Sequence, residues 1–171
     1  MKKVLISLVL AVALTLAIAV PAMATSSWDR PASVTVNTYI SATIADPGTA
    51  SINFGSLNPG TTNNAEVEQG AGNGAVTVTV AAETNVNCKI GTKASGDFTY
   101  LTNTIPLDPN ATWADSNGGT KTTMTTSYAQ VATSTAGTQK VQGVWHWLTV
   151  PTNTVPGTYT TTYSYKVDTS L

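Results

Sequence analysis

The sequence predicts an all-β protein, a single antiparallel β-sandwich that follows an N-terminal signal helix. Apolar and polar residues alternate with a period of two in most segments after residue 31, threonine fills many of the polar positions, and glycine, proline and asparagine separate the segments. Alternation places successive side chains on opposite faces of a strand, and β-branched threonine suits such a surface. Short strands between such turns are typical of sandwiches with a jelly-roll or an Ig-like Greek-key topology.

The first 24 residues have the features of a secretory signal peptide. A basic start at Lys2 and Lys3 precedes an apolar run over residues 4–20, and a triplet of small residues follows at 22–24. This order of charge, apolar run and small residues directs export and is then removed. The alternative is a retained membrane anchor, because the run is close to the length that spans a bilayer. We expect cleavage after Ala24 and a secreted protein, extracellular or at the cell surface.

Residues 25–45 form the predicted N-terminal strand region, and residues 46–171 form the predicted sandwich domain. Residues 32–45 alternate cleanly. One side of this strand carries the candidate donor-strand residues Val34, Val36, Ile40 and Ile44. A terminal strand can leave its own domain and complete the sheet of a neighbouring subunit, with alternate side chains in pockets. The alternative is that residues 32–45 pair within their own domain.

Further strands are predicted wherever the alternation resumes. They are expected at residues 51–54, 75–81, 85–90, 97–101, 121–131, 140–150 and 158–167, with loops at 61–74, 108–120 and 132–139. Turn signals lie at Asn58-Pro59-Gly60 and Val155-Pro156-Gly157. The segment 140–150 is apolar on both sides, which predicts a central strand that is covered on both faces.

The charge of the chain argues against nucleic acid and membrane partners. Lys2 and Lys3 leave with the signal peptide, so six basic and nine acidic side chains remain, for a net charge of −3. A mildly acidic chain without a basic cluster has no electrostatic attraction to nucleic acid. It also lacks the polybasic segment that holds proteins to anionic lipid after the signal is removed.

The residues that carry catalysis are sparse, so we expect no enzyme and no cofactor. The single histidine, His146, lies between two tryptophans, and no G-x-S-x-G or phosphate-binding motif is present. We interpret His146 as a hydrogen-bonded strand residue and the lone Cys88 as a small buried hydrophobe. Glu66 and Glu68 are the closest carboxylates in sequence, and we interpret their segment as a solvated loop.

Three weaker signals leave alternatives open. Trp113, Trp145 and Trp147 could stack on glycan rings, although large aromatic residues more often fill cores and interfaces. Asn110 begins an N-glycosylation triplet, Asn110-Ala111-Thr112. Oxygen-bearing side chains also gather around it, at Asp108, Asn110, Asp115 and Asn117, where Asx turns are the alternative to a calcium site.

Three segments resemble a known class of secreted proteins. They are FGSLNPG at 54–60, VWHWLTVP at 144–151 and PGTYTTTYSYKV at 156–167. Together they resemble the TasA/camelysin-like filament subunits, including archaeal bundling-pilus subunits. The resemblance implies a jelly-roll-like sandwich that polymerises through an N-terminal donor strand, and it carries over no catalytic residue. Thr61 follows the turn where camelysin-like proteins often have an acidic residue.

These features together predict a structural function. We expect a secreted subunit of an extracellular filament, pilus or surface layer that associates with itself into a homopolymer. The alternative is a monomeric carbohydrate-binding sandwich that uses Trp113, Trp145 and Trp147 on surface glycans.

Overall fold

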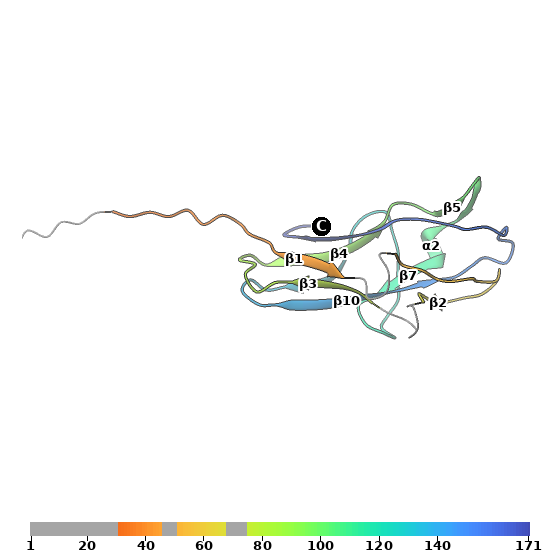
Figure 1. Cartoon of the computed structure of the whole chain (residues 1–171), viewed down its shortest axis with the longest axis horizontal. Coiled ribbons are helices and arrows are strands. Elements are labelled where there is room, and N and C mark those ends of the chain that lie inside the picture. The colour runs from red at the N-terminus through yellow and green to blue at the C-terminus, as the bar shows by residue number, and fades with distance from the viewer. Residues whose placement is uncertain (1–30, 46–50, 68–74) are drawn as a thin grey trace, which may run out of the picture. The chain divides into compact units, whose positions relative to one another are not determined.

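The computed structural model describes residues 31–45, 51–67 and 75–171 (Figure 1). The chain divides into a leading unit, Met1–Val36, and a main unit, Asn37–Leu171. The predicted signal helix and the cleavage site lie outside the described residues. So does the turn expected at Asp46-Pro47-Gly48.

The main unit is built from antiparallel strands, which confirms the all-β fold class. The strands are β1 (Ala42–Ala45), β2 (Asn64–Ala65), β3 (Val76–Val80), β4 (Cys88–Ala94), β5 (Phe98–Tyr100), β6 (Asn103–Ile105), β7 (Ala111–Ala114), β8 (Thr122–Thr123), β9 (Ala129–Ser134), β10 (Lys140–Leu148) and β11 (Tyr163–Asp168). A short helical turn, α2 (Leu107–Asn110), lies between β6 and β7. Its Asp108 and Pro109 depart from helical backbone angles.

Two sheets and a hairpin make up the sandwich (Figure 1). The larger sheet has the order β1-β3-β10-β7-β8, and β2 also pairs with β10. The smaller sheet has the order β11-β4-β9, and β5 pairs with β6. Residue Val131 bulges where β9 meets β4, because Ile90 is opposite Ala132 while Gly91 is opposite Gln130.

The core lies between the two sheets because the inward side of each strand is apolar. One cluster joins Val78 and Val80 of β3 to Cys88 and Ile90 of β4. A larger cluster fills the rest of the space with Phe54, Ala94, Phe98, Ile105, Leu107, Ala111, Trp113, Met124, Val144, Leu148 and Val150. Alternation in β3, where Val76, Val78 and Val80 are buried and the two threonines between them are not, shows how the sequence sets this arrangement.

Strand β10 is central, as the sequence predicted. It pairs with β3 over its first half and with β7 over its second half. His146, Trp147 and Leu148 are all buried although they alternate between faces. Both faces are therefore covered in the second half of the strand.

Several predicted boundaries are wrong. Within residues 32–45 only the last four residues are a strand, and no strand forms at 51–54. The predicted loop 108–120 contains β7, and the predicted loop 132–139 contains the end of β9. The predicted strand 121–131 is broken between β8 and β9, because residues 124–128 cross from one sheet to the other. Threonine is common in both loops and strands of this chain, so alternation alone does not mark the ends of a strand.

Candidate assembly edge

The leading segment carries two of the predicted donor-strand residues. Within the described part of the leading unit, residues 31–36 have no regular secondary structure. Val34 is 86% exposed and Val36 is 76% exposed. Both side chains are therefore available for contact with another surface.

The main unit begins with a segment that is held by side-chain and backbone hydrogen bonds outside any strand ladder. The amide of Tyr39 donates to the Asn85 Oδ1 at 2.8 Å, and the Asn85 amide donates to the Tyr39 carbonyl at 3.1 Å. The Asn85 Nδ2 also donates to the Asn37 carbonyl at 2.8 Å. Ser41 is held in the same way by Thr84 and Ala81. Residues 37–41 are therefore fixed to the domain although they are not in a strand.

Strand β1 pairs only with β3 among the described residues and forms one edge of the larger sheet. Its register places Ala42 beside Val80 and Ile44 beside Val78, so these pairs share the inward face. Val78 and Val80 are fully buried, yet Ile44 is 53% exposed and Ala42 is exposed. The inward face of β1 therefore extends past the cover that the smaller sheet provides. Ile40, just before it, is partly buried against the Val78 cluster.

The free edge of β11 lies on the same side of the sandwich as β1. Residues 124–128 join β8 to β9, so these two edge strands share one side. The opposite edges, β1 and β11, consequently share the other side. Among the described residues β11 is in register only with β4, over six residue pairs. We define the inward face of β1 and the free edge of β11 as the open flank.

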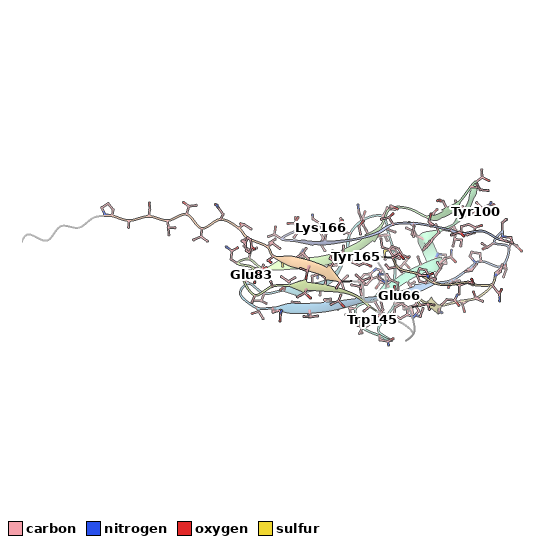
Figure 2. All side chains as sticks on the ribbon, in the orientation of Figure 1. Glu66, Glu83, Tyr100, Trp145, Tyr165 and Lys166 are labelled. Atoms are coloured by element: carbon pink, nitrogen blue, oxygen red, sulfur yellow. The ribbon has the colours of Figure 1, made fainter. Side chains whose placement is uncertain are left out.

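A buried polar cluster lies behind β11. The His146 Nδ1 is 3.3 Å from the Glu66 Oε2, and its Nε2 is 3.0 Å from the Tyr165 hydroxyl. A carboxylate only accepts, so Nδ1 carries a proton toward Glu66, and Nε2 of a neutral ring accepts from Tyr165. The Tyr163 ring stacks on the imidazole, with centroids 5.1 Å apart. Glu66 and Tyr165 are labelled in Figure 2.

The cluster joins three strands and is shielded from solvent. Glu66 follows β2, and its amide donates to the His146 carbonyl of β10 at 3.2 Å, while Tyr165 belongs to β11. His146 is 0% exposed and Glu66 is 6% exposed. Removing the imidazole would leave the buried Glu66 carboxylate without this donor, and such an unsatisfied buried group costs about 1–3 kcal/mol or more. The prediction of a hydrogen-bonded strand histidine is confirmed.

The prediction that Glu66 lies in a solvated loop is wrong. Its carboxylate is buried because β2 pairs with β10 and brings Glu66 beside His146. Glu66 and His146 are 80 residues apart, so no local pattern connects them. The one hint in the sequence is composition: the chain has a single histidine and few carboxylates, so each is a candidate for a specific interaction.

The three tryptophans do not form one platform. Trp113 of β7 lies directly opposite His146, so it points into the core, away from the face that carries Trp145 and Trp147. Trp147 is only 6% exposed, and the Lys121 Nζ lies 4.4 Å from its ring centroid. Trp145 lies over Gly143, where a Cβ would be 2.6 Å from its ring. Trp145 and Trp147 share one face of β10, as expected.

The Asn110 region is also turned inward. Asn110 is buried, and its Nδ2 donates to the Pro106 carbonyl at 3.0 Å. A glycan on this nitrogen would need space around a side chain that is only 9% exposed. Asp115 accepts from Ser116. Across the ranges that the structure describes, no three carboxylate, histidine or cysteine side chains come together as a metal site.

Comparison with protein-family models and with curated proteins gives no match. The resemblance to the TasA/camelysin-like class therefore stays a prediction. In the described ranges no helix has both the length and the apolar character needed to cross a bilayer. Cys88 is a free, buried thiol, as the sequence predicted.

Proposed function

We propose that the chain is a secreted structural subunit of an extracellular filament, pilus or surface layer that assembles by β-strand addition. The observation that carries this proposal is the open flank. Ile44 is 53% exposed although its neighbour on the same sheet face, Val78, is 0% exposed. An apolar row beside a free strand edge is a site to which another strand can add.

The leading segment of a second copy fits this site chemically. Its Val34 and Val36 alternate with polar residues, so both would face the core while the backbone pairs with β11. Full burial of a valine side chain contributes about 1.5–3 kcal/mol. Ordering the backbone costs about 1–2 kcal/mol per residue. Apolar burial alone therefore does not drive assembly, and the hydrogen bonds to β11 must supply the rest.

This function requires no catalytic residue and no cofactor, and its partner is another copy of the same chain. Export by the predicted signal peptide would bring the subunit outside the cell, where assembly follows. The sandwich supplies a rigid body, and the leading segment supplies the connection between bodies.

The direct test is to place a charge where the donor side chains would be buried. In Val34→Asp with Val36→Asp, we expect filaments or large assemblies to disappear, because a carboxylate buried without a partner is strongly unfavourable. Electron microscopy and sedimentation of the purified protein give the measurement. Both residues are exposed, so the melting temperature of the unassembled protein should not change.

The control is Val155→Asp, which adds a like charge at an exposed valine in a turn. This variant should assemble normally. Deleting residues 25–36 should also abolish assembly while it leaves β1 in place. Assemblies of normal appearance from either the double substitution at positions 34 and 36 or the deletion would contradict strand addition.

A further inference from the structure

The outward face of the smaller sheet gathers most of the positive charge of the described chain. In β4 Lys89 and Lys93 point outward, and Gly91 between them is buried beneath the Leu171 side chain, where a Cβ would lie 2.7 Å from the Leu171 Cδ2. In β11 Lys166 points outward from the position opposite Gly91. Three of the five lysines in the described ranges thus lie on one face. Figure 2 shows Lys166 on the side of the sandwich away from Trp145.

This charge is only partly neutralised. Lys166 forms an ion pair with Asp168 at 2.8 Å, and its Nζ also donates to the Ser170 carbonyl. Within the ranges that the structure describes, neither Lys89 nor Lys93 is within ion-pair distance of a carboxylate. The whole chain has a net charge of −1, so the face is positive against an acidic background.

An aromatic ring lies among these lysines. Tyr128 is partly exposed, and the Lys93 Nζ lies 4.8 Å from its ring centroid while the Lys166 Nζ lies 5.9 Å from it. Both distances are within the range of cation–π attraction. Two cations near one ring repel each other, so an anion that bridges them would be attracted by both.

One carboxylate and several uncharged hydrogen-bonding groups share this face with the lysines, and Asp168 of β11 lies opposite Lys89. By register, Gln130 and Thr133 of β9 and Ser164 of β11 share the outward face. Four residues of strand separate Lys89 from Lys93, which is about 13 Å along the sheet. A single small anion cannot span this distance, whereas a polymer with repeated carboxylates can.

We propose that the lysine face, made of Lys89, Lys93, Lys166 and Tyr128, binds an acidic polysaccharide. The ammonium groups pair with its carboxylates, and a sugar ring stacks on Tyr128. This binding is independent of strand addition, since it uses the opposite side of β11 from the core.

The test measures binding of polygalacturonate to the purified chain at concentrations where light scattering shows a monomer. We expect saturable binding that weakens at least tenfold between low salt and 0.5 M NaCl, because exposed charge pairs are screened. Lys93→Gln with Lys166→Gln should weaken binding at least tenfold. The matched control, Lys121→Gln with Lys140→Gln, removes the same charge elsewhere and should change affinity less than twofold.

A second comparison separates sugar recognition from simple charge attraction. Tyr128→Ala should weaken polygalacturonate binding severalfold and leave binding of poly-L-glutamate unchanged. The proposal is overturned if polygalacturonate does not bind. It is also overturned if the control pair of substitutions weakens binding as much as the pair on the lysine face. Equal or tighter binding of poly-L-glutamate or of anionic phospholipid vesicles also overturns it. Because the protein is monomeric in this test, a failure leaves the assembly proposal untouched.

Discussion

At the scale of single residues, Tyr163 places a hydroxyl in an apolar environment. Its ring packs edge-on against Phe98, with centroids 6.1 Å apart, and stacks on His146. Among the described residues its buried hydroxyl has no hydrogen-bond partner. Burial raises the pKa of this hydroxyl above its ordinary value, and the negative charge of Glu66 raises the pKa further. The packing of the ring therefore comes at the cost of an unsatisfied polar group.

The raised pKa predicts how stability falls in alkaline solution. An unfolded tyrosine releases its proton near pH 10, whereas folded Tyr163 still holds it. The folded state then binds more protons, so stability is complete below about pH 10 and decreases above it, by at most about 1.4 kcal/mol per pH unit. Tyr163→Phe should remove this part of the decrease and cost less than about 1 kcal/mol at pH 7.

Urea unfolding of the wild-type and variant proteins between pH 7 and 11 measures this difference. Tyr39→Phe is the control, because Tyr39 is exposed. A Tyr163→Phe variant whose stability decreases above pH 10 as steeply as that of the wild type would show that Tyr163 ionises freely in the folded protein.

At the scale of elements, strand β10 is shaped by the contact between Gly143 and Trp145. The Trp145 ring lies over Gly143, and Ala75 borders the same space. Ala114, opposite Trp145 in β7, is buried on the outward face. The ring therefore covers part of the face of β10 that is turned away from the smaller sheet.

This contact predicts an effect of a single methyl group. In Gly143→Ala the new Cβ would lie 2.6 Å from the Trp145 ring and 3.1 Å from the Ala75 Cβ. The ring must move, and we expect a loss of about 1–3 kcal/mol in the free energy of unfolding. Gly96→Ala meets nothing within 4 Å and should change stability by less than about 0.5 kcal/mol. If urea unfolding gave the Gly143→Ala variant the same stability as the wild type, the Trp145 ring would not lie on Gly143.

At the scale of the whole molecule, the sandwich is held by its core and its ladders without an internal disulfide. The only cysteine, Cys88, is buried in the cluster that joins the two sheets. Burial raises the pKa of its thiol, which lowers the fraction of reactive thiolate. Cys88 therefore reports on separation of the sheets.

We expect a thiol reagent to label Cys88 at least about a thousandfold more slowly in the native protein than in 8 M urea, because access requires an opening of at least about 4–5 kcal/mol. Mass spectrometry over time gives the rate. Complete labelling of the native protein within minutes would mean that the two sheets part readily around β4.

The fold class followed from alternation, but the function of individual positions did not. Inward rows such as Val76, Val78 and Val80 were predicted because burial on one face imposes a period of two. The open flank was invisible in sequence, since Ile44 and Val78 occupy equivalent positions in their strands and differ only in what lies across from them. Trp113 was misplaced in a loop because asparagine and glycine surround it, although its pairing with β10 makes it a core residue.

The hydrogen bonds that join Asn85 to Tyr39 and Asn37 have a mechanical consequence. If subunits are linked through their leading segments, tension along the fibre enters each body at these three hydrogen bonds. Behind them β1 is aligned with β3 over four residue pairs that would share the load. Under tension, the hydrogen bonds at the start of the main unit should then break before the sandwich unfolds. The bonds of Asn85 would break first.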